Sequence, residues 1–123
     1  MNPERRSFFY FLCTALYAAV LLIVLLLPSE SMPEHKVFSA DKIWHLLSYS
    51  LLTMGLMFSF REGGWKRGYN RRWSLVIALA HAGISEVLQN FSPGRSADLG
   101  DWIANCAGIG IALLALRFFP DFF

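Results

Sequence analysis

Polar side chains that can bind charged groups or transfer protons lie at helical spacing in three apolar segments of this sequence and in a loop beside them. Within each segment they are mostly three or four residues apart, so a helix would place them on one face. The lysine and the arginine can pair with phosphate or carboxylate, and the carboxylates and amides can bind hydroxyl or amine groups. The candidate ligand-binding residues are Asp41, Lys42, His45, Tyr49, Glu86, Gln89, Arg95, Asp98, Asp101 and Asn105.

Acid–base catalysis is an alternative role for the same residues. Glu86 or His45 could act as a general base, and Asp41, one helical turn before His45, could orient the imidazole. These three residues are the catalytic candidates. A metal ion held by His45, Asp98 and Asp101 would be a variant, but their spacing matches no metal-binding motif. We therefore predict neither a metal nor a cofactor.

Structural roles compete with both functions. The aspartates stand at predicted helix starts, where acidic caps favour the helix dipole, and Asn105 could hold two helices together. His81 has no predicted partner among the polar set, so we interpret it as structural. Capping does not explain His45, Glu86 or Asn105, which lie beyond the first turn. Because these three reach one common depth, we predict a functional site there.

The segments that position these residues have the length of membrane spans. The chain has 123 residues, 55% of them hydrophobic, and its mean hydropathy is +0.43. A bilayer core about 30 Å thick needs about 20 mostly apolar residues per helix. Four blocks fit: 8–27, 41–60, 73–91 and 98–119. We predict an all-α membrane protein, one four-transmembrane-helix domain over 1–123, with short connections between antiparallel helices.

Basic residues are distributed unevenly between the predicted loops. The positive-inside rule then predicts that the N- and C-termini are cytoplasmic and that the polar site faces outward. Paired glycines in REGGWKRGYNRR predict a turn between the second and third helices. The inner segments carry Arg5, Arg6, Arg61, Lys66, Arg67, Arg71, Arg72 and Arg117, and the outer segments carry Lys36, Lys42 and Arg95.

Charge and cysteine content argue against two other classes of protein. The net charge is +2 and the basic residues flank the predicted spans, where lipid headgroups account for them, so we predict no nucleic-acid partner. Cys13 and Cys106 lie inside apolar blocks without metal-site spacing and are predicted to be small packing residues. No good cleavage site follows the first block, so we predict an uncleaved helix that forms an apolar wall.

Two stretches of the sequence together resemble the VanZ-like family. They are DKIWHLLSYSLLT in the second predicted helix and ISEVLQNFSPGRSADLGDWIANCAGIGIA across the third and fourth. The family pattern is Asp-Lys-x-x-His and a Tyr, then Glu-x-x-Gln, then Arg, Asp, Asp and Asn-x-x-Gly, and this chain completes it at Gly108. The resemblance covers nearly the whole chain, although the first helix matches only in being apolar.

The resemblance implies a small bacterial membrane protein of the cell envelope. The family is named after a protein associated with resistance to the glycopeptide teicoplanin, and the resemblance implies no particular activity. We expect a multi-pass protein of the bacterial cytoplasmic membrane, with the bilayer as a partner. The expected function is binding of an amphiphilic envelope ligand: a lipid headgroup, a lipid-linked precursor or a glycopeptide antibiotic.

Two alternatives stay open at this point. The first is a membrane-embedded acid/base or metal-assisted enzyme that acts on a lipid-linked substrate. The second is a purely structural bundle whose polar residues hold the helices together. The sequence leaves open the identity of the ligand, the oligomeric state and any link to antibiotic resistance.

Overall fold

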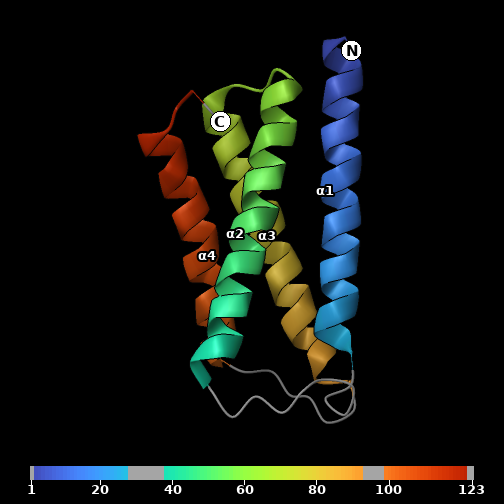
Figure 1. Ribbon diagram of the computed structural model, residues 1–123, viewed down its shortest axis with the longest axis vertical. Coiled ribbons are helices and arrows are strands. Elements are labelled where there is room, and N and C mark those ends of the chain that lie inside the picture. Colours follow the sequence, from blue (N-terminus) through green and yellow to red (C-terminus); the bar gives the residue numbers. More distant parts are fainter. Residues whose placement is uncertain (1, 28–37, 93–98, 122–123) are drawn as a thin grey trace.

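The chain folds into four α-helices. The computed structural model describes residues 2–27, 38–92 and 99–121, with the backbone alone for residues 38–41. Within these ranges there is no strand, so the prediction of an all-helical chain is confirmed. The helices are α1 (Pro3–Leu26), α2 (Phe38–Glu62), α3 (Arg67–Gln89) and α4 (Leu99–Phe118), shown in Figure 1.

Three helices begin earlier than the hydropathy pattern predicted: α2 starts at Phe38 rather than at 41, and α1 and α3 differ by more. α1 starts at Pro3 rather than near residue 8, because Asn2 caps it: the Asn2 Oδ1 accepts a hydrogen bond from the Arg5 backbone N at 2.9 Å. Proline suits the first helical position, where its missing N–H would have no helical partner. α3 starts at Arg67 rather than near residue 73. Arginine is a good helix former, so the basic segment continues the helix beyond its apolar part.

A turn of four residues, 63–66, joins α2 to α3, inside the longer segment where the sequence predicted one. Gly64 adopts a φ of 77°, and its N donates to the Arg61 carbonyl at 2.9 Å. The Trp65 N donates to the Phe60 carbonyl at 3.0 Å, and the two aromatic rings lie 4.4 Å apart. This is a Schellman motif with its hydrophobic contact, which ends α2 and reverses the chain.

Replacing Gly64 with alanine should lower the free energy of unfolding by about 1 kcal/mol, because a Cβ is disfavoured at this positive φ. No atom lies within 4 Å of the added Cβ, so the effect comes from the backbone alone. Gly68→Ala is the matched control, since its added Cβ also meets open space but stands within α3. Unfolding midpoints in detergent measure the difference. Equal midpoints for the two variants would refute the assignment of strain to Gly64.

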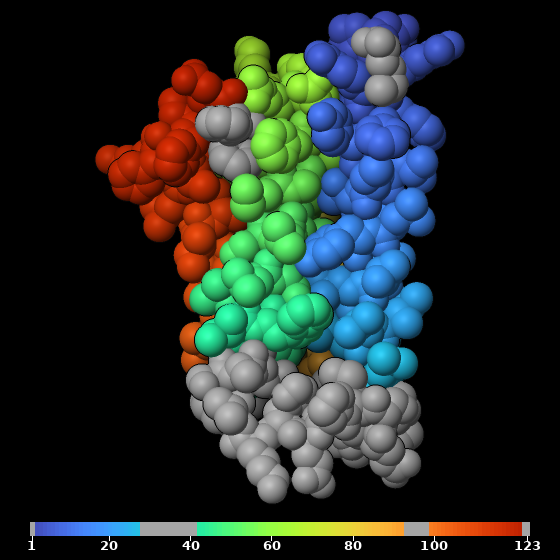
Figure 2. Space-filling model, viewed as in Figure 1, coloured from blue at the N-terminus to red at the C-terminus, as the bar shows by residue number. Residues whose placement is uncertain are grey.

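α2 is the central helix of the bundle. It contacts α1, α3 and α4, whereas α1 and α4 do not contact each other. Figures 1 and 2 show α2 in front, between α1 on one side and α4 on the other. The start of α1, the end of α4 and the α2–α3 turn lie at one end of the bundle (Figure 1). The starts of α2 and α4 therefore meet the end of α3 at the opposite end.

Three of the helices are long and apolar enough to cross a membrane: α1, α2 from Lys42 onward, and α4. α3 is long enough, with 23 residues, but it is too polar to be recognised as a span by its composition. The reason is that α3 buries a polar face, which includes Asn70, Ser74, Ser85, Glu86 and Gln89. Its exposed residues include large apolar ones, such as Val76, Ile77, Ile84 and Val87. Apart from the exposed arginines of its first two turns, the polar residues of α3 thus face the other helices.

Candidate functional site

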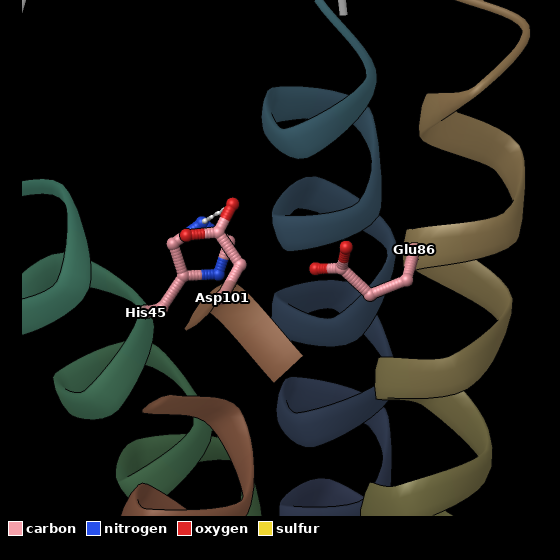
Figure 3. Close-up of side chains that lie close together, drawn as sticks. All are labelled: His45, Glu86 and Asp101. Atoms are coloured by element: carbon pink, nitrogen blue, oxygen red, sulfur yellow. Dashed lines mark ion pairs between the residues drawn. The ribbon is translucent and has the colours of Figure 1, made fainter. Parts of the chain in front are cut away.

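Hydrogen bonds and an ion pair join the start of α2 to the start of α4. Lys42 Nζ donates to Asp101 Oδ1. His45 Nδ1 lies 2.8 Å from Asn105 Oδ1, and His45 Nε2 lies 3.6 Å from Asp101 Oδ2 (Figure 3). The two oxygens of the Asp101 carboxylate therefore face two different partners on α2.

α3 contributes a third charged side chain. Glu86 is 7% exposed, and its carboxylate points from α3 toward His45 and Asp101 in Figure 3. One potential ligand atom from each of these three residues lies within 4.8 Å of the other two. Glu86 therefore belongs to the interior of the bundle rather than to its lipid-facing surface. We call the set Lys42, His45, Glu86, Asp101 and Asn105 the polar cluster.

Close packing of α2 against α4 sets these distances. Lys42 and His45 are three residues apart on α2, and Asp101 and Asn105 are four apart on α4, so each pair shares a face. Gly108 follows on the same face of α4, and a Cβ built there would lie 2.2 Å from the Leu46 carbonyl oxygen. The glycine lets the two backbones approach, as small residues do where membrane helices pack closely. Short side chains can then meet across the interface.

Asn105 is fully buried, and its amide is only half used. Its Oδ1 bonds to His45, but its Nδ2 has no hydrogen-bond partner among the described residues. A buried N–H without an acceptor costs about 1–3 kcal/mol, so such groups are rare in folded proteins. The unused donor lies beside the charged side chains of the polar cluster.

Tyr49 lies deeper and makes different contacts. It is fully buried, and its OH lies 2.9 Å from both His81 Nδ1 and Ser85 Oγ. His81 Nε2 lies 2.9 Å from the Ala18 carbonyl, which can only accept, so Nε2 carries a proton and donates it to this carbonyl. The prediction that His81 has no partner in the polar set was therefore wrong. This chain of bonds ties α1, α2 and α3 together.

Gln89 is placed against the end of α1. Its Nε2 donates to the Leu25 carbonyl at 3.0 Å, and Ser92 Oγ donates to the Leu26 carbonyl at 2.7 Å. These carbonyls belong to the last turn of α1, where no helical N–H is available to them. α1 is thus more than the apolar wall that we predicted, because its backbone accepts hydrogen bonds from α3 and from the residues after it.

Three predicted site residues cannot be placed at the site. Arg95 and Asp98 lie outside the described residues, and so does the side chain of Asp41. The prediction that Asp41 orients His45 is therefore untested, whereas Asn105 and Asp101 do contact that imidazole. The functional role of all ten predicted residues stays a prediction.

The sequence interpretation missed two polar residues of α3 that the structure connects. His81, Ser85 and Gln89 follow one another at intervals of four residues, which is the spacing of a single helix face. That spacing could have linked His81 and Ser85 to the predicted set.

Two cavities in the described part of the chain are lined by residues outside the polar cluster. One of about 300 Å³ lies between α1 and α2, beside Tyr17 and Gly55. Another, of about 330 Å³, lies at the opposite end of the bundle, beside Arg67, Arg71 and Arg117.

Long apolar helices that surround a buried charged cluster define a helical membrane protein. A family model described as VanZ/LLP1 matches residues 14–120. The chain therefore belongs to the VanZ/LLP1 family, and the resemblance seen in the sequence is confirmed. No curated protein and no solved structure matches the chain.

Proposed function

We propose that this VanZ/LLP1-family membrane protein binds the polar headgroup of an amphiphilic envelope ligand at the polar cluster. The ligand classes are a lipid headgroup, a lipid-linked precursor and a glycopeptide antibiotic. One observation carries the proposal: charged side chains from three helices gather in one buried layer at one end of the bundle. Charged groups at membrane depth are costly, and they typically mark sites of binding or transport.

Uncharged polar contacts elsewhere in the bundle strengthen this argument. Thr14 Oγ1 lies 3.2 Å from Ser59 Oγ, Ser50 Oγ donates to the Gly108 carbonyl, and Asn70 Nδ2 donates to the Met57 carbonyl. These neutral contacts occur at several depths, as expected of groups that only hold helices together. Neutral polar groups are thus sufficient to hold the helices together. The charged side chains of the polar cluster therefore call for a role other than helix association.

The unused donor of Asn105 indicates what the headgroup offers. Nδ2 needs an acceptor, so the bound group presents an oxygen there, as phosphate, carboxylate and sugar hydroxyl groups do. The acyl or other apolar part of the ligand would lie along exposed apolar residues near the same end, such as Trp44, Leu47 and Ile103. An amphiphile thus fits this end of the bundle, with its headgroup at the polar cluster and its apolar part along the exposed apolar residues.

The proposal includes an orientation in the membrane. α3 crosses the membrane as well as the three more apolar helices, which makes four spans. Both termini are cytoplasmic, and the polar cluster lies near the outer face of the bacterial cytoplasmic membrane. The start of α1 and the end of α4 lie at one end of the bundle, together with the α2–α3 turn (Figure 1). This arrangement supports termini on the same side of the membrane, because an even number of spans returns the chain to its starting side. The basic residues at that end, including Arg61, Arg67 and Arg117, agree with a cytoplasmic location.

Native mass spectrometry of the purified protein tests the proposal. We expect the parent to retain an amphiphile, and Glu86→Gln and His45→Ala to retain at least about tenfold less while they remain folded, because each loses a charge-assisted contact. Asn70→Ala is the matched control at the opposite end. It should lose about 1–3 kcal/mol of stability, since its buried bond to Met57 is removed, yet keep the ligand.

Two results would contradict the proposal. One is an equal loss of ligand in Asn70→Ala, which would show that ligand retention merely follows stability. The other is undiminished retention in both cluster variants. In either case the polar cluster would be a structural feature of the bundle.

An enzyme that acts on the same ligand is the second candidate, and the surroundings of His45 favour it. Asn105 fixes the imidazole through Nδ1, while Nε2 faces the carboxylate of Asp101 with that of Glu86 close by. A positioned imidazole of this kind suits proton transfer. Turnover of a lipid-linked substrate by the parent, lost in His45→Ala, would establish this role instead of simple binding.

A further inference from the structure

We propose that His45, Glu86 and Asp101 bind a divalent transition-metal ion, with His45 Nε2 and one carboxylate oxygen from each acidic residue as ligands. The proposal deepens the function proposed above and rests on the same site. It revises the expectation from the sequence, in which His45, Asp98 and Asp101 were considered as ligands and no metal was predicted because their spacing matches no metal-binding motif. Among the described residues, this is the place where three such side chains converge.

The distances fit a metal site better than a direct hydrogen bond. His45 Nε2 lies 3.6 Å from Asp101 Oδ2, which is longer than the usual N–H···O distance. In a tetrahedral site with ligand bonds of about 2.0–2.1 Å, neighbouring ligand atoms are about 3.3 Å apart. The ligand atoms of His45, Glu86 and Asp101 all lie within 4.8 Å of one another, so small side-chain movements would complete the site.

Neighbouring residues already hold two of the three ligands in the required orientation. Asn105 Oδ1 accepts from His45 Nδ1–H, which leaves the Nε2 lone pair directed at the carboxylates. Lys42 binds Asp101 Oδ1, which leaves Oδ2 on the side of the imidazole. Partners that fix the second atom of each ligand in this way are characteristic of metal sites in proteins.

Charge leads to the same conclusion. A lone pair on His45 Nε2 beside the carboxylates of Asp101 and Glu86 favours a positive species among these three side chains, in addition to Lys42 on Asp101 Oδ1. A proton on Nε2 or a metal ion would each supply that charge. Binding of a metal ion would displace a proton from Nε2, so the titration below tests directly for the ion.

The donor set indicates which ions to expect. One imidazole nitrogen and two carboxylate oxygens suit Zn²⁺ or Mn²⁺, and Zn²⁺ should bind more tightly. Three protein ligands leave a coordination position open, as in catalytic rather than purely structural zinc sites. An oxygen of the headgroup fits that position, and the unused Nδ2 of Asn105 is a donor for the same ligand.

Metal titration of the full chain in detergent tests the proposal. With the purification tag removed and metals stripped by a chelator, Zn²⁺ should bind at one ion per chain and raise Tm by at least about 5 °C at a hundredfold excess over Kd. His45→Gln, Glu86→Gln and Asp101→Asn should each weaken binding at least about tenfold. The chain has three histidines, so His35→Ala and His81→Gln are the controls and should bind like the parent.

A second measurement needs no variant and covers the case in which a substitution prevents folding. The parent loaded with Mn²⁺ should show hyperfine coupling to one imidazole nitrogen in pulsed electron paramagnetic resonance. Absence of that coupling, no Zn²⁺ binding by the parent, or equal binding by the parent and the three cluster variants would each overturn the metal site.

Failure of the metal site can be told apart from failure of the proposed function. Zn²⁺ binding is measured without any amphiphile, and ligand retention is measured on the metal-stripped parent. Retention without Zn²⁺ binding would overturn the metal proposal alone. Zn²⁺ binding without a retained amphiphile, in either the loaded or the stripped protein, would overturn the headgroup proposal alone.

Discussion

Gly108→Ala is expected to separate α2 from α4 and to cost at least about 3 kcal/mol of stability, at the upper end of the range for overpacking. The added Cβ would lie 2.2 Å from the Leu46 carbonyl oxygen and 3.0 Å from its carbon. Both are backbone atoms, which cannot rotate away as a flexible side chain can. The Ser50 Oγ bond to the Gly108 carbonyl, at 2.9 Å, would also be strained when the helices move apart.

Gly110→Ala is the matched control for this prediction. It stands two residues further along α4, and no atom lies within 4 Å of its added Cβ. Alanine favours a helix by about 1 kcal/mol over glycine, so this variant should be as stable as the parent or more so. Unfolding in detergent, followed by circular dichroism, compares the three proteins. A Gly108→Ala protein as stable as Gly110→Ala would disprove the close backbone contact.

Lys42→Met is expected to cost about 3 kcal/mol, because it leaves the Asp101 carboxylate buried without its ion-pair partner. Methionine keeps most of the length and apolar volume of the lysine stem, so packing changes little. The double variant Lys42→Met/Asp101→Leu should recover most of the lost stability, since a buried ion pair can be replaced by apolar side chains with little loss.

The same double variant separates stability from function. It should fold, yet it should retain neither the amphiphile nor Zn²⁺, because we propose that Asp101 contacts the headgroup and coordinates the metal ion. A double-mutant cycle of unfolding free energies gives the coupling between the two residues. Additive losses of stability, with no coupling, would contradict the ion pair as a stabilising contact.

Spacing within one helix could be predicted from the sequence, and pairing between helices could not. The intervals around His45 and Asn105 correctly indicated inward faces on α2 and α4. They suggested Asp41 as the orienting partner of His45, because a helical periodicity reports only neighbours on the same helix. The contact between His45 and Asn105 depends on how closely α2 and α4 approach, and Gly108 was the one local sign of that distance.

The convergence of the three proposed metal ligands could not be predicted from the sequence for a related reason. Short motifs reveal a metal site when its ligands stand on one helix or in one loop. His45, Glu86 and Asp101 are spread over three helices, so their convergence depends on the register of the whole bundle. The contact of α1 with α3 was hidden for a different reason: α1 accepts the hydrogen bonds of His81 and Gln89 through backbone carbonyls, which every residue has.

The way in which the other helices contact α1 bears on how its sequence can vary. His81, Gln89 and Ser92 bond to carbonyls of α1 at Ala18, Leu25 and Leu26, and these acceptors persist whichever side chains those positions carry. Within the described chain, only Thr14, Leu21 and Leu25 of α1 are buried. Most of α1 should therefore tolerate exchange among apolar residues, with the exception of Thr14 and Tyr17, whose side chains form hydrogen bonds with α2.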